Sequence, residues 1–561
     1  TSNNSTKNSS ELNITNIKFD ELSKLIKGSV FLLFEVEGAR ILSYQVMLES
    51  GEVFQVKGGQ FGDWIQDPKI LKFSHGIKSL ARLQEVKGIA FDTELAAYLI
   101  NPGSRNLNLI DLTEKYLGII SNREELFSEG DSDEIKNLEK LVPVLKSELK
   151  NSGMEKLYFD LELPILELLA KIERVGVGVD VEALKNEAKF FEAEVENETK
   201  AAYKLVGREF NVNSPKQLQV VLFDDLKLPK TKKIKTGYTT DAESLEWLFA
   251  KSKHPFLQHL LRIRETSKLL SVIEGLISSV AKDGRIHTEF QQTIAATGRL
   301  SSINPNLQNI PIRTDEGRRI RNHFIPKPPY SKLLTADYSQ IEMRILAHLA
   351  EDEKLLEAFA SGEDLHSTVG SFVFGVKVNE VTPDMRRQIK AMSYGLAYGL
   401  TAFGLSQQLD IGPGEASALM EKYYQRFGGI RDYLATVVVE AKKVGYTQTI
   451  MGRRRYLPDL QNENKFKREI AERAALNAPI QGSAADIIKL AMLRVEKAIK
   501  DANMKSRLLL QIHDELFFEY VDSELDQLVE LVREEMGSAY PLKAPLSVNI
   551  GHGRSWHAAE H

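Results

Sequence analysis

The sequence contains no cysteine among its 561 residues. Disulfide bonds, thiolate zinc sites and a cysteine nucleophile are therefore excluded. Long apolar runs are missing as well: no stretch approaches the roughly 18 consecutive apolar residues that a membrane helix needs, and no signal peptide is visible. We therefore expect no membrane span, and the lack of cysteine is compatible with a reducing compartment.

The sequence also lacks an excess of basic residues. It has 73 Lys and Arg against 78 Asp and Glu, which gives a formal net charge of -5. Because nucleic-acid binders usually carry a basic surface, this average argues against such a partner. At roughly 150 residues per domain, the length suggests about three or four domains.

The first part of the chain alternates between patterns. The polar, Ser- and Asn-rich start predicts a disordered linker over residues 1–27. Short apolar runs predict strands at 30–35, 41–47 and 53–56, followed by helices at 77–85 and 94–100. This succession is typical of an α/β or α+β domain. A polar, acidic stretch predicts a solvated loop and helix at 121–150, and further helices are expected at 161–174 and 182–205.

Local charge departs from the average. Residues 213–240 contain six Lys against two Asp, namely Lys216, Lys227, Lys230, Lys232, Lys233 and Lys235 against Asp224 and Asp225. This segment is either a solvated, mobile loop or a flexible tip that grips a phosphate backbone. Two further basic clusters are Arg313, Arg318, Arg319 and Arg321, and Arg453, Arg454, Arg455, Lys465, Lys467 and Arg468.

Two segments place carboxylates at strand ends. The apolar run 333–336 delivers Asp337 before a helical pattern begins at Gln340. Such a carboxylate suits a hard divalent cation, although an Asp that caps a helix is the commoner meaning. Residues 507–520 predict a β-hairpin with Asp514 and Glu515 at its bend. Turn chemistry alone explains many such acids, but adjacent acids repel each other, and a bound cation would relieve that repulsion.

A third segment, residues 382–399, begins with helix-start signals, Thr382 and a proline. Four side chains spaced four residues apart form one stripe on this helix: Arg386, Lys390, Tyr394 and Tyr398. Cations followed by aromatic rings suit a nucleotide, whereas the alternative is a solvated basic face with buried tyrosines.

Two more segments carry polar groups that suit sugar and phosphate. Residues 295–311 predict an irregular segment rich in amides and hydroxyls, with Arg299 near its start. Arg473, Asn477 and Gln481 share one helical stripe, and we expect Pro479 and Gly482 to interrupt that helix.

These motifs together carry a family resemblance. Asp-Tyr-Ser-Gln-Ile-Glu at 337–342, Arg-x-x-x-Lys-x-x-x-Tyr-Gly from 386, and His-Asp-Glu at 513–515 occur in the order of motifs A, B and C of family A DNA polymerases. Thr-Gly-Arg-Leu-Ser-Ser and Asn-Leu-Gln-Asn-Ile-Pro strengthen the resemblance, and it extends from about residue 28 to the end.

The resemblance implies an α/β plus α+β multidomain fold: an RNase H-like 3′–5′ exonuclease-like domain, then a right-hand polymerase. The implied divisions are a linker at 1–27, the exonuclease-like domain at 28–153, thumb and connecting helices at 154–285, palm at 286–345, fingers at 346–480, and palm again at 481–561. A 5′-nuclease domain carried by bacterial members is expected to be absent, either removed or never present.

The implied reaction is DNA-templated addition of dNTPs to a primer 3′-hydroxyl, in repair and replication gap filling. Two Mg²⁺ ions would be held by Asp337, Asp514 and the backbone carbonyl of Tyr338. Glu515 would support them, and Lys390 would donate a proton to the departing pyrophosphate.

The resemblance also implies contacts with both substrates. The dNTP would meet Arg386, Lys390, Tyr394, Tyr398, Gln340, Glu342 and His366, with Glu342 as the steric gate against a ribose 2′-hydroxyl. Primer-template DNA would meet Arg299, Asn477, Gln481, His513, Arg473, Lys232, Lys233 and Lys235. Because Tyr394 stands where members carry Phe or Tyr, we predict ready acceptance of dideoxynucleotides.

The first domain departs from the proofreading pattern of the family. Its first acidic motif appears as Glu35 and Glu37, with a longer first side chain. The second motif falls near Gly76 and Leu80, which lack the required groups, and the third, expected near 134–145, has no match. We therefore expect no exonuclease activity.

Two other functions stay open: a non-catalytic DNA-binding scaffold, and a polymerase whose main template is RNA. The resemblance further implies a monomer in the bacterial cytoplasm, associated with the nucleoid and with no membrane partner.

Overall fold

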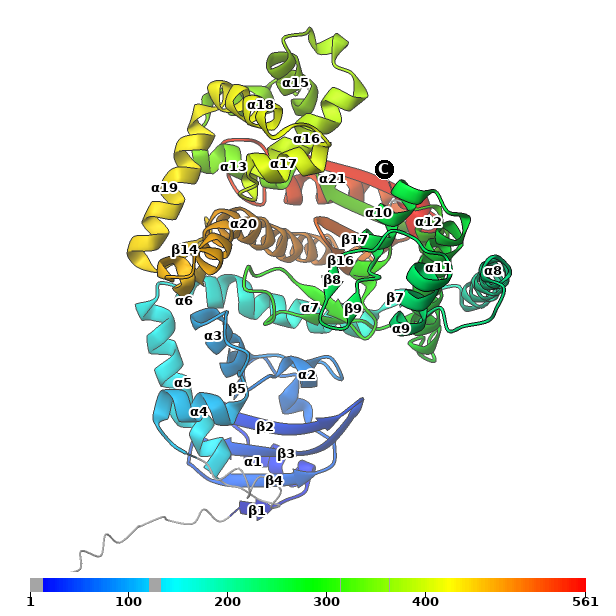
Figure 1. Cartoon of the computed structure of the whole chain (residues 1–561). Helices are drawn as coiled ribbons and strands as arrows, with labels where there is room; N and C mark the ends of the chain where they lie inside the picture. Colours follow the sequence, from blue (N-terminus) through cyan, green and yellow to red (C-terminus); the bar gives the residue numbers. More distant parts are fainter. Residues whose placement is uncertain (1–13, 121–132, 313, 363, 561) are drawn as a thin grey trace, which may run out of the picture.

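The computed structural model describes residues 14–120, 133–312, 314–362 and 364–560. A six-stranded sheet forms the N-terminal unit, at the bottom of Figure 1, in the order β1-β4-β3-β2-β5-β6. Strands β2, β3 and β4 form an antiparallel meander, while β5 and β6 run parallel to β2. The strands are β1 (Ile14–Asn16), β2 (Ser29–Glu37), β3 (Arg40–Leu48), β4 (Val53–Lys57), β5 (Leu71–Ser74) and β6 (Ile89–Asp92).

Helices cover this sheet. They are α1 (Phe19–Leu25), α2 (Lys78–Ala81), α3 (Thr93–Ile100), α4 (Leu109–Leu117) and α5 (Asp133–Asn151). The predicted strands and the helix at 94–100 are confirmed, but the helix expected at 77–85 is only the short α2. After α2 the chain turns at Arg82 and Leu83. The Arg82 side chain forms ion pairs with Glu289 and Glu173.

The predicted linker at 1–27 is wrong for its second half. Strand β1 adds to the sheet by pairing in parallel with β4, and α1 buries Leu22 completely. Apolar side chains at 14, 17, 19 and 22 supply the surface that this packing needs. Residues 1–13 lie outside the described part of the chain, as do 121–132 within the predicted acidic loop.

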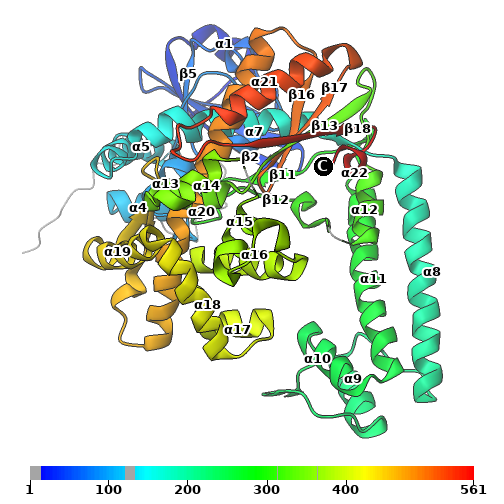
Figure 2. The same cartoon turned by 90° about the horizontal axis from the view of Figure 1, so that it is seen from above.

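A connecting region follows and leads into a long helical arm. It consists of α6 (Glu155–Leu157), a π-helical turn η3 (Tyr158–Glu162) and α7 (Leu163–Val175). The arm comprises β7 (Val177–Gly178), α8 (Val181–Val206), α9 (Pro215–Gln219), η4 (Val220–Asp225), β8 (Lys233–Ile234), β9 (Gly237–Tyr238), α10 (Ala242–Ser252) and α11 (Pro255–Ser278). Figure 2 shows α8 and α11 side by side, with α9 and α10 at their far end. That end has its own hydrophobic core around Leu218, Leu222 and Phe256.

The central unit is a four-stranded antiparallel sheet in the order β16-β17-β13-β18. Its strands are β13 (Lys332–Tyr338), β16 (Arg507–Ile512), β17 (Glu515–Tyr520) and β18 (Val548–Gly553). It is preceded by β10 (Arg285–Ile286), β11 (Glu289–Gln291), β12 (Ser301–Ile303) and α12 (Asp315–Asn322). Thus part of the segment expected to be irregular at 295–311 is a strand, because β12 pairs with β11. Helices α20 (Lys465–Asp501), α21 (Leu525–Gly537) and α22 (Trp556–Ala559) pack around the sheet.

Helices inserted between β13 and α20 form the upper part of Figure 1. They are α13 (Ile341–Ala350), α14 (Glu353–Ala360), α15 (Leu365–Phe374), α16 (Pro383–Ala397), α17 (Ala402–Leu409), α18 (Pro413–Arg426) and α19 (Gly428–Val444), followed by the ribbon β14 (Tyr446–Gln448) and β15 (Arg454–Tyr456). One continuous core of buried apolar side chains joins this region, the central sheet and the N-terminal unit. Among the described residues, no helix is long and apolar enough to span a membrane.

Helix α20 corrects one expectation. It runs without a break through Pro479 and Gly482, although the sequence predicted an interruption there. Ser483 Oγ donates a hydrogen bond of 2.5 Å to the Pro479 carbonyl within the helix. A side chain at 482 would stand 2.6 Å from Thr449 Cγ2, so glycine here permits close packing of Thr449, which follows β14, rather than a break.

Candidate active site

Three carboxylates meet at one end of the central sheet. Asp337 lies opposite Glu515 in the β13–β17 pair. The Tyr338 backbone N–H donates to the Asp514 carbonyl at 3.2 Å. Asp337 does not cap the next helix, because Gln340 occupies the N-cap position of α13. The helix-cap alternative for Asp337 is therefore wrong.

The hairpin turn differs slightly from its prediction. His513 and Asp514 form the turn between β16 and β17, while Glu515 begins β17 and pairs with Ile512. His513 adopts a left-handed backbone with φ of 53°, a conformation uncommon for a residue other than glycine. Only one of the two expected acids therefore stands in the bend, and the other faces Asp337 across the sheet.

The electrostatics of this cluster are unfavourable without a cation. Burial and the charge of Asp514 raise the pKa of Asp337 to about 7. Burial and Glu342 raise the pKa of Asp514 to about 6, and burial and Asp337 raise that of Glu515 to about 7. Buried like charges favour protonation or a bound cation. Hard oxygen donors of this kind fit Mg²⁺, although no group of three or more His, Asp or Glu side chains is arranged as a metal site in the described ranges.

Helix α16 carries the predicted stripe. Thr382 caps it by accepting the Met385 N–H at 3.2 Å. Arg386 near its start and Lys390 in its middle are exposed. Tyr394 is partly buried, and Tyr398 lies just beyond the end of the helix. Burial raises the pKa of Tyr394 to about 12, and the nearby charges of Glu342, Asp514 and Asp337 add to this shift. The stripe therefore runs toward the carboxylates.

Asp364 was not anticipated in the sequence. It caps α15 and also forms a two-pronged ion pair with Arg386, at 2.8 and 3.0 Å. His366, two residues on, is 2% exposed, and burial lowers its pKa to about 4. Its ring centre lies 6.1 Å from that of Tyr394. An Asp before a helix is normally read as a cap, which is why its second role escaped prediction.

Glu342 lies at the centre of a polar cluster. It is 6% exposed, and its carboxylate accepts hydrogen bonds from Arg299 and from the Tyr398 hydroxyl. Gln481 on α20 also hydrogen-bonds Tyr398. Predicted nucleotide and DNA contacts from three distant parts of the chain thus meet at one carboxylate.

Several predicted site residues carry buried polar atoms that have no partner in the described part of the protein. They are Gln340 Oε1, His366 Nδ1 and Asn477 Oδ1. Buried polar atoms are nearly always hydrogen-bonded in folded proteins. Their clustering among the expected substrate contacts is therefore consistent with a site that a polar ligand completes. Arg473, on the same stripe of α20, is exposed.

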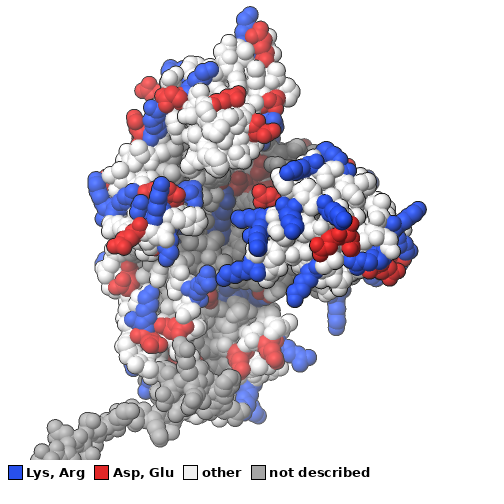
Figure 3. Space-filling model, in the orientation of Figure 1, with Lys and Arg blue, Asp and Glu red and all other residues white. Residues whose placement is uncertain are grey.

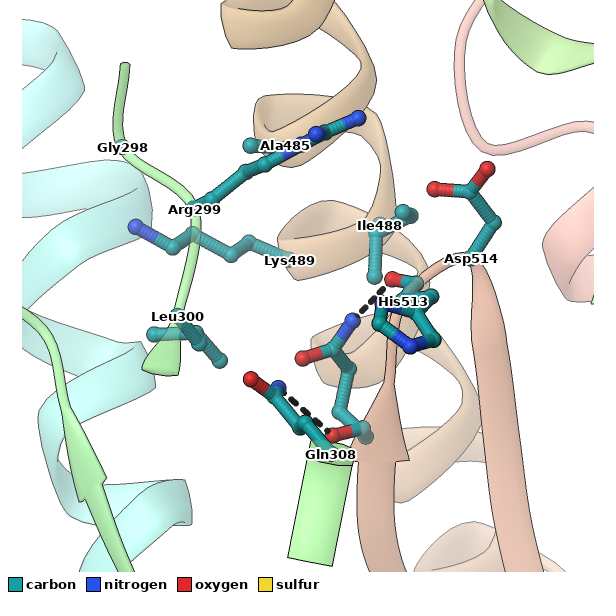
Figure 4. Close-up of a pocket in the computed structure, with 10 residues that line it drawn as sticks. Gly298, Arg299, Leu300, Gln308, Ala485, Ile488, Lys489, His513 and Asp514 are labelled. Atoms are coloured by element: carbon teal, nitrogen blue, oxygen red, sulfur yellow. Dashed lines mark hydrogen bonds between the residues drawn. The ribbon is translucent and has the colours of Figure 1, made fainter. Parts of the chain in front are cut away.

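A cavity of about 200 Å³ lies beside Asp514 (Figure 4). Its lining is Gly298, Arg299, Leu300, Gln308, Ala485, Ile488, Lys489, Gln511, His513 and Asp514. Gln308 Nε2 donates to the Gln511 carbonyl at 3.3 Å, and the Gln511 amide donates to the carbonyl of His513. The sequence offered a signal for Gln511, a polar residue inside an apolar strand, but no role was assigned to it or to Gln308.

The basic clusters separate into two kinds. Lys232, Lys233 and Lys235 are exposed at the β8–β9 tip of the arm. Figure 3 shows Lys and Arg side chains gathered on this arm, at the right of the view, beside a hollow. By contrast, Arg321 and Arg453, from the other two basic clusters, are buried and ion-paired and add no basic surface. Arg313 lies outside the described residues.

Comparison with known proteins agrees with this geometry. The profile of DNA polymerase family A matches residues 181–558. DNA polymerase I of Mycobacterium tuberculosis is 52% identical over 519 residues, which cover 89% of this chain and 57% of that protein. DNA polymerase I of Bacillus subtilis is 41% identical over 547 residues, which cover 93% and 62%. The chain thus spans about three fifths of the length of these curated relatives.

A solved structure is similar over nearly the whole chain. The POL domain of Pol1 from M. smegmatis, in complex with DNA primer-template and dNTP, is 49% identical, with a TM-score of 0.89. The match covers 97% of this chain and 98% of that one. The resemblance drawn from the motifs is confirmed: this chain belongs to DNA polymerase family A.

Proposed function

We propose that this protein is a DNA-templated DNA polymerase that adds dNTPs to a primer 3′-hydroxyl. The observation that carries the proposal is the meeting of Asp337 and Asp514, from distant parts of the chain, next to the α16 stripe. The similarity to a polymerase domain solved with primer-template and dNTP supports the same substrates here. Repair and replication gap filling are the corresponding cellular tasks, in a monomer acting on nucleoid DNA in the bacterial cytoplasm.

Each residue of the site has a role in this proposal. Asp337, Asp514 and the Tyr338 carbonyl would hold two Mg²⁺ ions, which when bound activate the primer 3′-oxygen and neutralise developing charge. Arg386 and Lys390 would bind the triphosphate, with Lys390 placed to protonate pyrophosphate. The orphaned nitrogen of His366 would complete that set. Glu342 would exclude a 2′-hydroxyl, and Glu515 would support the metal ligands.

DNA would be held on the other side of the same site. Arg299, Asn477, Gln481 and His513 would contact the primer terminus and template, with Arg473 beside them. Contacts of this kind in the minor groove check pair geometry without strong sequence preference. Lys232, Lys233 and Lys235 would bind the phosphate backbone of the duplex at the tip of the arm, acting as the thumb.

We further propose that the N-terminal unit is an RNase H-like exonuclease fold without exonuclease activity. The antiparallel meander followed by parallel strands supports the fold. Glu35 and Glu37 are exposed on β2, and no third acid joins them as a metal site in the described ranges. Trimming of a mismatched primer with Mg²⁺, at equal rates in wild type and Asp337→Ala, would refute this proposal.

Primer extension tests the main proposal and its alternatives. Wild-type protein should extend a primer on a DNA template with Mg²⁺, while Asp514→Ala should bind the same duplex but not extend it. Binding without extension by the wild type would indicate a scaffold instead. Faster extension on an RNA template than on DNA would indicate the other alternative.

A further inference from the structure

The N-terminal unit makes direct contact with the segment that delivers Arg299. This segment, residues 293–299, connects β11 to the polar cluster around Glu342. The Tyr98 hydroxyl on α3 donates a hydrogen bond of 2.6 Å to the Ala295 carbonyl. Thr293 Oγ1 donates to Glu94 Oε1 at 3.3 Å. Tyr98 is 1% exposed, so its hydrogen bond is shielded from water.

The same segment also packs against a buried guanidinium. Gly298 has φ of 83°, and a side chain there would lie 2.5 Å from Arg453 Nε. The Arg453 guanidinium donates to Asp486 at 2.7 and 2.9 Å and pairs with Glu162. Glu162 belongs to the π-helical turn that leads from the N-terminal unit into α7. The segment thus contacts α3 of the N-terminal unit directly, and through Arg453 it borders the turn that leads out of that unit.

The position of the segment determines the position of Arg299. Gly298 N–H donates to the Ala295 carbonyl at 3.0 Å, which closes a tight turn immediately before Arg299. The Gly298 backbone also hydrogen-bonds the Tyr98 hydroxyl. Arg299 then reaches Glu342, whose carboxylate it shares with Tyr398. A chain of direct contacts therefore runs from α3 to the predicted steric gate.

We propose that the N-terminal unit serves polymerisation by holding the 293–299 segment, with Tyr98 as a positioning residue for Arg299 and the Glu342 carboxylate. This inference rests on the proposed polymerase function. It gives the N-terminal unit a task that does not require exonuclease chemistry. Tyr98 is buried, and its contribution would pass through the Ala295 carbonyl and the backbone of Gly298.

The test compares two tyrosines of the same unit. Tyr98→Phe removes the hydroxyl that reaches the 293–299 segment. Tyr44→Phe is the matched control, because Tyr44 is also 1% exposed and donates a 2.8 Å hydrogen bond to a carbonyl, that of Gln60, within the N-terminal unit itself. The readout is the ratio of kcat/KM for a dNTP to that for the matching rNTP. This ratio does not depend on the fraction of folded enzyme.

We expect Tyr98→Phe to lower this ratio by about two- to tenfold, the range of one intramolecular hydrogen bond. Tyr44→Phe should leave the ratio at its wild-type value. In an Arg299→Ala background, Tyr98→Phe should cause no further change, because the residue through which it acts is gone. An equal ratio in Tyr98→Phe and Tyr44→Phe, or an undiminished effect in the Arg299→Ala background, would overturn the inference. Absence of extension by the wild type would instead refute the proposed function itself.

Discussion

The buried carboxylates of the site should lower the folding stability of the metal-free protein. The substitution Asp337→Asn should restore part of that stability. The pKa of Asp337 rises from 3.8 to about 7 through burial and the charge of Asp514. The folded protein therefore binds this proton more tightly than the unfolded chain. Ionisation costs folding free energy above about pH 7, and the cost disappears as pH falls toward 4.

The expected gain in folding stability follows from the size of the Asp337 pKa shift. One pKa unit corresponds to about 1.36 kcal/mol, so the full shift amounts to roughly 4 kcal/mol for a group shielded from water. Asp337 keeps partial solvent contact, and screening reduces the expected gain to about 2 kcal/mol. Asparagine keeps the shape of the side chain and removes the charge. We expect Asp337→Asn to unfold at a temperature a few degrees higher than wild type at pH 8 in EDTA, and to have no polymerase activity.

Thermal unfolding with and without Mg²⁺ measures this effect. Mg²⁺ should stabilise the wild type and should stabilise Asp337→Asn much less, because one of its ligands is lost. Asp522→Asn is the control at the opposite end of the same sheet, where Asp522 pairs with Lys332 at 3.1 Å and its pKa is lowered by Ser331 and Lys332. That substitution should not raise the unfolding temperature. The reasoning fails if Asp337→Asn is less stable than wild type in EDTA, or if Mg²⁺ stabilises both equally.

Three further expectations concern single residues. Burial alone would raise the pKa of Glu162, but Arg453 and Lys489 outweigh burial and lower this pKa from 4.5 to about 2. The stability that the ionised carboxylate provides is present above pH 4.5 and is lost as pH falls toward 2. Glu162→Gln should therefore cost about 3 kcal/mol of stability at pH 7 and flatten the acid limb of an unfolding titration followed by fluorescence. Gly298→Ala forces a side chain against Arg453 at a positive φ, and should lower stability by about 1–3 kcal/mol together with the dNTP-to-rNTP ratio; unchanged values in both assays would contradict the packing. Tyr394→Phe should discriminate more strongly against dideoxynucleotides than wild type in primer-extension competition, and equal discrimination would remove the role assigned to the hydroxyl.

Local patterns predicted the local structure of the site. The apolar run before Asp337, the hairpin around Asp514 and the capped helix of Arg386 are all present, because strand alternation and helix signals depend on neighbours in the sequence. The meeting of Asp337 and Asp514 depends on strand pairing between distant segments, and only the family resemblance supplied it. The sequence did not predict burial either. Arg453 and Arg455 are identical in type and two positions apart, yet Arg453 lies in a buried ion network and Arg455 is part of strand β15, opposite Thr447.

Pro479 and Asp364 show why one prediction was wrong and one contact was missed. Pro479 predicted a helix break, but the packing of α20 along most of its length preserves the helix around it. Asp364 has the local signature of a cap, and its pairing with Arg386 depends on how α15 and α16 pack. In both cases tertiary contacts, which composition and spacing do not record, decided the outcome.

The division of the hydrophobic interior has a practical consequence for engineering. The sequence length suggested three or four domains. The described residues contain one main core that runs from Leu22 to Ala559, a separate one at the end of the arm, and two small clusters of three to five buried residues. Excision of the N-terminal unit would expose apolar surface on η3 and α7, against which α2, α3 and β6 now pack. The end of the arm, around α9 and α10, closes its own interior and is the place where a graft or exchange would disturb the remainder least.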